Sequence, residues 1–240
     1  MTTVVISQPM FFPWVGFFEQ LSLADIFVYY DDVQFSKGSF TNRVQVWNGS
    51  KVDWLSVPIL KQSLQQSIAD VSIDQSKNWR RKHLEKLQQS YAKAPYCDEM
   101  IDLVTTVYAQ NHSHISSLSI NSIETVSNYF GLATNKTILN SSQLDIGGNS
   151  SQRVLDIVKH LNGNTYITGH GAKNYLEHEL FEEQQVKVRY MDYQKLAYPQ
   201  LSPIFTPYIS ILDLIANCGT QGKQYICSQS QYWKEFLNEY

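Results

Sequence analysis

The chain lacks the long apolar runs, the cysteine pairs and the charge of one sign that mark several classes of protein. No run of about 18 apolar residues occurs and no charged segment precedes an apolar one at the start, so we expect no membrane span, no signal peptide and a cytoplasmic location. The three cysteines form no CxxC pair, which leaves a disulfide framework and a zinc site unsupported. The net charge is −3 and no basic stripe is present, so nucleic-acid binding is not indicated.

Several catalytic motifs are also missing. The sequence has no Gly-x-Ser-x-Gly elbow, Walker loop, His-Glu-x-x-His or complete Gly-x-Gly-x-x-Gly, so serine-hydrolase, metal and dinucleotide classes have no support. What it does have is tyrosine, with 15 residues in 240. Tyrosine is typical of the boundary between core and surface, and equally of sites whose walls carry rings and hydroxyls, as in sugar and nucleotide sites.

The first thirty residues follow the order strand, loop, helix, strand. Residues 4–7 form a β-branched run, Pro9 and Pro13 interrupt regular structure, residues 15–24 have helical spacing, and residues 26–30 form a second strand. This βαβ unit predicts parallel strands. A hairpin then interrupts the pattern, with strands at 44–47 and 54–57 around an Asn48-Gly49 turn.

The middle of the chain is helical and the α/β alternation then returns. Helices are predicted at 79–91, 101–109 and 115–130, the last ended by Gly131, and they define a helix-rich subdomain at about 76–132 within a single domain that spans residues 1–240. Strands are predicted at 135–139, 165–168 and 186–190, and helices at 150–161, 174–183, 210–216 and 233–240. The sequence thus predicts an α/β fold with a Rossmann-like, mostly parallel sheet, an inserted β-hairpin and a helical middle region.

Polar side chains follow the first two predicted strands. The first strand leads into Gln8 and the second into Asp31 and Asp32, and parallel neighbours would open their ends onto one crevice. Asn42 and Arg43 would enter from the next loop, with Arg43 able to hold a carboxylate or phosphate through two hydrogen bonds. In the alternative interpretation, the two aspartates cap a turn and Arg43 pairs with one of them.

Two later segments are further candidates. Gly169 and His170 lie between a strand and a helix, where backbone N–H groups suit an anion and a histidine can act as a general base near neutral pH. The alternative is a tight turn with an incidental histidine. Ser210 is predicted to cap a helix with Asp213 completing the capping box, although Asp213 could instead face a site.

These same segments resemble the WbqC-like family of bacterial O-antigen and polysaccharide gene clusters. The resemblance lies in Ile6–Phe18, Tyr30–Phe35, Asn42-Arg43, Tyr166–Tyr175 and Phe205–Asp213, and it extends over essentially the whole chain. It implies transfer of glycine or another acyl group to the amine of a nucleotide-linked amino sugar, a transferase role in surface-polysaccharide biosynthesis.

That implied reaction assigns roles to the candidate residues. Asp31, Asp32 or His170 would accept the amine proton. The substrate contacts would come from charged, amide, aromatic and turn residues, namely Lys37, Arg43, Gln8, Asn42, Phe12, Trp14, Tyr208, Gly169 and Asp213. The implied partners are a nucleotide sugar and an acyl carrier. ATP or an acyl-carrier donor is left open as the cofactor, and no metal is expected.

A more distant similarity is to adenylate-forming, nucleotidyltransferase-like domains, which begin with a strand, a loop and a helix in this order. Pro13 and Phe17 stand where those domains carry two histidines, so standard nucleotide transfer is not expected from this loop. Two alternatives to acyl transfer therefore stay open. One is an ATP-dependent amide-forming ligase of the adenylating type, and the other is a non-catalytic protein that binds a sugar nucleotide or a partner.

Overall fold

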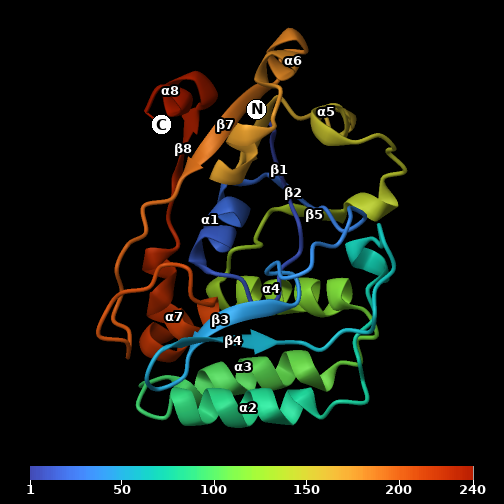
Figure 1. Cartoon of the computed structure of the whole chain (residues 1–240). Helices are drawn as coiled ribbons and strands as arrows, with labels where there is room; N and C mark the ends of the chain where they lie inside the picture. The colour runs from blue at the N-terminus through green and yellow to red at the C-terminus, as the bar shows by residue number, and fades with distance from the viewer. Residues whose placement is uncertain (240) are drawn as a thin grey trace.

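A six-stranded sheet forms the centre of the computed structural model, which describes residues 1–239 (Figure 1). The strand order is β5-β2-β1-β6-β7-β8. The strands are β1 (Thr3–Ser7), β2 (Ile26–Tyr29), β5 (Thr137–Asn140), β6 (Thr165–Thr168), β7 (Lys187–Asp192) and β8 (Gln229–Tyr232). Neighbouring strands are parallel except β7 and β8, which are antiparallel. The predicted Rossmann-like α/β fold with a mostly parallel sheet is confirmed.

Both faces of the sheet are covered at its centre, which explains why β1 and β2 are nearly continuous apolar runs. On one face Val5 and Phe27 pack with α1 (Val15–Leu23), and on the other Val4 and Val28 pack with the second set of helices. That second set is α5 (Ser150–His160), α6 (His178–Glu183) and α8 (Trp233–Glu239). The predicted end of the last helix at Tyr240 lies outside the described residues.

One prediction near the second face is corrected, and one strand there was not predicted. The helix predicted from Asn174 begins at His178, because residues 170–174 form a separate 3-10 turn. Strand β8 was not expected, because its residues are polar and its antiparallel pairing is supported by side chains. The Arg189 guanidinium, for example, donates a hydrogen bond to the Ser230 hydroxyl over 2.8 Å.

The hairpin and the remaining helices form the end of the molecule opposite α6 and α8 (Figure 1). They are β3 (Arg43–Trp47), β4 (Val52–Ser56), α2 (Trp79–Ser90), α3 (Cys97–Ala109), α4 (Ile115–Phe130) and α7 (Ile211–Cys218). Gly131 ends α4 in the left-handed conformation, with φ 62°, as predicted. This region shares one apolar core with Val5 and Phe27 of the sheet.

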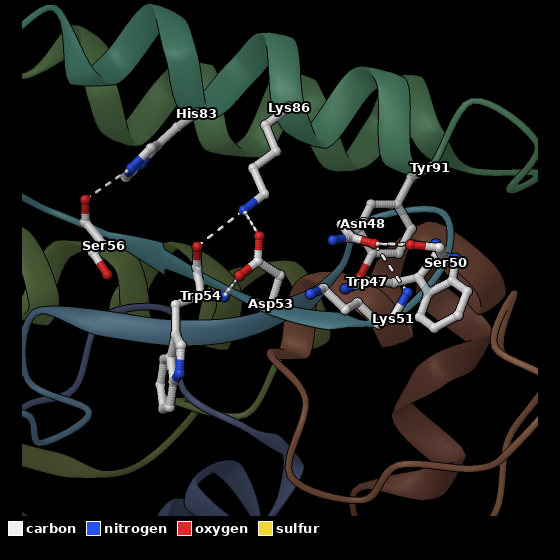
Figure 2. A network of polar contacts seen from close by, with 10 residues as sticks. All are labelled: Trp47, Asn48, Ser50, Lys51, Asp53, Trp54, Ser56, His83, Lys86 and Tyr91. Atoms are coloured by element: carbon white, nitrogen blue, oxygen red, sulfur yellow. Dashed lines mark hydrogen bonds and ion pairs between the residues drawn. The ribbon is translucent and has the colours of Figure 1, made fainter.

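Polar contacts fix α2 against the hairpin (Figure 2). The Lys86 ammonium lies 2.8 Å from the Asp53 carboxylate and 3.0 Å from the Trp54 carbonyl oxygen. His83 Nε2 lies 3.0 Å from the Ser56 carbonyl oxygen, and burial lowers the His83 pKa to about 4, so the ring is neutral at pH 7. The hairpin is therefore a fixed element beside the sheet.

Across residues 1–239, no helix combines the length and the apolar composition needed to cross a bilayer.

Candidate ligand-binding site

A cleft opens beside β1, where the order in which successive strands are added to the sheet reverses. Strand β1 leads through α1 to β2 on one side, whereas its other neighbour, β6, leads to β7 on the opposite side. Ligands of open α/β sheets bind at the carboxyl ends of the strands at such a point. A cavity of about 370 Å³ lies there, between the ends of β1 and β6.

The lining of this cleft is mostly apolar, and its polar groups are uncharged. Its amides are those of Gln8 and Gln20, and its hydroxyls include those of Ser7, Tyr30, Thr168 and Tyr175. Trp14, Phe17 and Met10 add apolar surface, and no lining residue of the described chain is Asp, Glu, Lys, Arg or His. Groups that both donate and accept hydrogen bonds, set among rings, suit a neutral polyhydroxylated ligand.

The Trp14 indole is positioned by the glycine two residues later. A Cβ at Gly16 would lie 2.0 Å from the Trp14 ring, so only glycine lets the indole lie back against the start of α1. Tyr193 and Tyr208 hold the indole edge-on from outside, with ring centroids 4.7 and 5.4 Å from its own. The segment from Pro13 to Gly16 therefore fixes one aromatic wall of the cleft.

Gln20 and Gly169 connect the two sides of the cleft. A Cβ at Gly169 would lie 2.7 Å from Gln20 Nε2, so the amide lies directly against the turn after β6. The Tyr166 hydroxyl donates to Thr168 Oγ1 over 3.3 Å, and burial raises the Tyr166 pKa, which keeps that hydroxyl protonated. Sequence reasoning missed Gln20; its spacing of three from Phe17 places both on one face of α1 and was the available signal.

Asp31 and Asp32 are engaged outside this cleft. The buried Asp31 carboxylate accepts hydrogen bonds from the Ser142 N–H over 3.1 Å and the Ser142 hydroxyl over 3.0 Å. Asp32 forms an ion pair of 2.5 Å with Arg153 and lines a separate hollow of about 330 Å³. Arg153 thus occupies the place that the alternative interpretation gave to Arg43.

Lys37, Asn42 and Arg43 line another hollow, beside the hairpin. The Asn42 amide donates to the Val57 carbonyl over 3.0 Å, and the Arg43 guanidinium stacks 4.1 Å from the Trp54 ring centroid. The structure therefore does not bring these residues into one crevice with Gln8, and it separates both groups from the aspartates.

Phe12 and Tyr208 do not line the cleft. Phe12 has no exposed surface and packs edge-on against Phe11 in the core, so it cannot stack on a ligand in the cleft. Its φ of 39° is held by Ser122, which accepts from the Phe12 N–H, and by Ser210, which donates to the Phe12 carbonyl. Tyr208 is exposed and packs edge-on against Trp14, which lines the cleft.

His170 follows Gly169 but turns toward β7. Its Nε2 lies 2.7 Å from the Met191 carbonyl oxygen, and because a carbonyl only accepts, Nε2 carries the proton in this contact. The ring also packs 4.8 Å from Phe236, centroid to centroid. His170 thus adjoins the cleft without lining it.

The predicted cap of α7 is confirmed, but its capping box is wrong. The Ser210 hydroxyl accepts from the Leu212 N–H over 3.2 Å. Asp213 does not reach back to the helix start. Its carboxyl is buried beside Tyr91, Tyr198 and Gln200, and burial raises its pKa to about 6.

Glu19 on α1 is a second buried acid, and sequence reasoning missed it. Only 1% of its surface is exposed, and neither carboxyl oxygen has a hydrogen-bond partner among the described residues. Burial raises its pKa to about 8, and the nearby Asp192 charge acts in the same direction. The group is therefore mostly neutral at pH 7.

Comparisons with known proteins agree with the resemblance in the sequence. The model of the WbqC-like protein family matches residues 8–225. The uncharacterized protein Rv1507c of Mycobacterium tuberculosis is 28% identical over 229 residues, which cover 94% of this chain and 98% of that protein. No solved structure gives a significant match.

Proposed function

The chain belongs to the WbqC-like protein family, and from that premise we propose that it transfers an acyl or aminoacyl group, such as glycyl, to the amine of a nucleotide-linked amino sugar in surface-polysaccharide biosynthesis. One observation carries the proposal, namely the uncharged lining of the cleft between β1 and β6. A sugar ring offers hydroxyls at its edge and C–H groups on its faces, which match amides and aromatic rings respectively. The cavity of about 370 Å³ has the size of a small-molecule site.

The reaction needs an oriented acceptor and a route for one proton. The amine nitrogen attacks the donor carbonyl, a C–N bond forms, the bond to the leaving group breaks, and the amine loses a proton to a base. In this proposal Gln8 and Gln20 orient the acceptor, and Trp14 packs on the sugar face.

His170 is our first candidate for the base, because it adjoins the cleft next to Gly169, although its ring does not line it. Asp31 and Asp32 come second, because Ser142 and Arg153 already engage their carboxylates.

Binding of a sugar nucleotide without catalysis is a second candidate. It is supported by the same lining, since the lining residues include no carboxylate, imidazole or ammonium group. The two candidates differ in turnover, not in ligand.

A mass-spectrometric assay tests the proposal. The purified chain is incubated with a nucleotide-linked amino sugar and with glycine plus ATP or an acyl-carrier thioester as donor. We expect a product heavier by the acyl group, and we expect Gln20→Leu to lose it while Gln89→Leu, an exposed position on α2, retains it. Measurable binding of the amino sugar with no product from any donor would refute transfer and leave the binding function standing.

A further inference from the structure

A hollow of about 610 Å³ lies at the open end of the hairpin, where β3 begins and β4 ends. Its polar wall carries three cationic side chains, Lys37, Arg43 and Lys61, and none of its lining residues is acidic. No ion pair within residues 1–239 involves any of the three. We propose that this cationic hollow binds the phosphate group of a ligand, at a position separate from the cleft between β1 and β6.

Arg43 is held ready for an anion. Gly38 has φ +84°, and a Cβ there would lie 3.1 Å from Arg43 Nη2, so a side chain at this position would crowd the guanidinium. The Gly38 carbonyl accepts a hydrogen bond from Nη2, and the Trp54 ring lies 4.1 Å from the guanidinium carbon. A guanidinium fixed in this way loses little freedom when it binds phosphate.

One donor of Arg43 is unused. Its Nε is buried and has no acceptor within hydrogen-bonding distance in the described part of the chain. Buried donors without partners are uncommon in folded proteins, so this N–H of Arg43 is available to pair with an anion that binds the guanidinium. Arginine binds phosphate through two parallel N–H groups.

The two lysines come from different loops and both are exposed. Lys37 precedes the Gly38 turn, and Lys61 follows β4. Three like charges around one hollow repel each other in the absence of acids, and a bound phosphate of nearly two negative charges relieves that repulsion. The chain as a whole has a net charge of −3, so this concentration of positive charge is local.

A series of contacts connects Arg43 in the cationic hollow to the loop after β1, through Trp54 and Phe40. The Phe40 ring lies 5.7 Å from the Trp54 ring, centroid to centroid, and the Phe40 carbonyl accepts from the Phe11 N–H over 3.1 Å. Met10, which directly precedes Phe11, lines the cleft. The phosphate therefore belongs either to the nucleotide of the acceptor or to the phosphopantetheine arm of an acyl carrier. This choice of sources rests on the proposed function, whereas the phosphate site does not.

Titration calorimetry on the full chain tests the site. The probes are uridine diphosphate and pantetheine 4′-phosphate, each compared with its phosphate-free parent, uridine or pantetheine. We expect at least one phosphorylated probe to bind about tenfold more tightly than its parent and to weaken as salt is added. The tighter probe identifies the source of the phosphate.

Matched variants locate the binding. Lys61→Gln and Arg43→Lys should weaken the phosphorylated probe about tenfold, whereas Lys51→Gln, an exposed position on the same hairpin, should not. Thermal unfolding checks that each variant is folded. Equal binding of phosphorylated and parent probes, or equal losses in Lys61→Gln and Lys51→Gln, would overturn the proposal. Gln20→Leu should leave probe binding intact. If the wild-type chain binds the phosphorylated probe but transfers no acyl group from any donor, the result counts against the proposed function alone.

Discussion

Replacing Glu19 by glutamine should stabilise the protein at neutral pH and remove part of the pH dependence of its unfolding. The pKa of this buried carboxyl rises from 4.5 to about 8 on folding. At pH 7 the unfolded chain therefore ionises Glu19 while the folded protein keeps it mostly neutral. Because the folded pKa is the higher one, the stability present below pH 4.5 is lost as the pH rises toward 8.

The size of this effect follows from the same shift. Each pH unit in the window costs about 1.4 kcal/mol of unfolding free energy, so the loss between pH 4.5 and pH 7 is about 3 kcal/mol. Glutamine has nearly the same shape and does not titrate. The free energy of unfolding of Glu19→Gln relative to wild type should therefore increase steadily over this range.

Urea unfolding followed by tryptophan fluorescence at several pH values measures this difference. Glu183→Gln, an exposed position on α6, serves as the control and should show no such trend. A difference between Glu19→Gln and wild type that stays constant from pH 5 to pH 7 would refute the reasoning, because it would mean that the folded protein accommodates the ionised carboxylate.

Two further substitutions probe the walls of the sites. Gly16→Ala should crowd the Trp14 ring, lower the stability by about 1–3 kcal/mol and change the fluorescence of the protein. Gly147→Ala, with open space around it, should do neither. Unchanged fluorescence in both variants would contradict the close packing of Trp14 against Gly16. Arg153→Met should leave Asp32 without its ion-pair partner and cost about 2 kcal/mol. Adding Asp32→Asn should recover part of that loss in a double-mutant cycle, and strictly additive losses would show that the pair is not coupled.

Elements defined by local signals were predictable from the sequence. Helix α4 ends where Gly131 takes a positive φ, and the hairpin turns at Asn48. The Asn48 side chain accepts from the Ser50 and Lys51 N–H groups, which explains why that turn signal is strong. Strand β8 had no such signal, because its polar sequence becomes a strand only beside β7.

The composition of the cleft was less predictable, because it depends on which strand lies next to β1. Val4 pairs with Ile26 on one side and with Tyr166, far along the chain, on the other. The residue pattern of β1 does not reveal that β6 will be its second neighbour. The sequence therefore indicated Gln8, Trp14 and Gly169 from local context and missed Gln20.

The position of β5 beside β2 explains why Asp31 and Asp32 do not line the cleft. Asp31 meets Ser141, whose hydroxyl accepts from the Asp31 N–H over 3.2 Å, because β5 lies on the far side of β2. Asp31 and Ser141 are 110 residues apart, and the residue spacing around either one does not predict their contact.

The position of β6 beside β1 also has a consequence for the order in which the protein forms. The β1–β2 pair closes a short loop, whereas the β1–β6 pair must join residues 4 and 166. Contacts that are so distant along the chain are slow to form. A nascent chain that has not yet reached β6 can pair β1 with β2, but it has only one wall of the cleft. Ligand binding at this site should therefore be among the last properties acquired during synthesis and refolding, and it can serve as a signal that folding is complete.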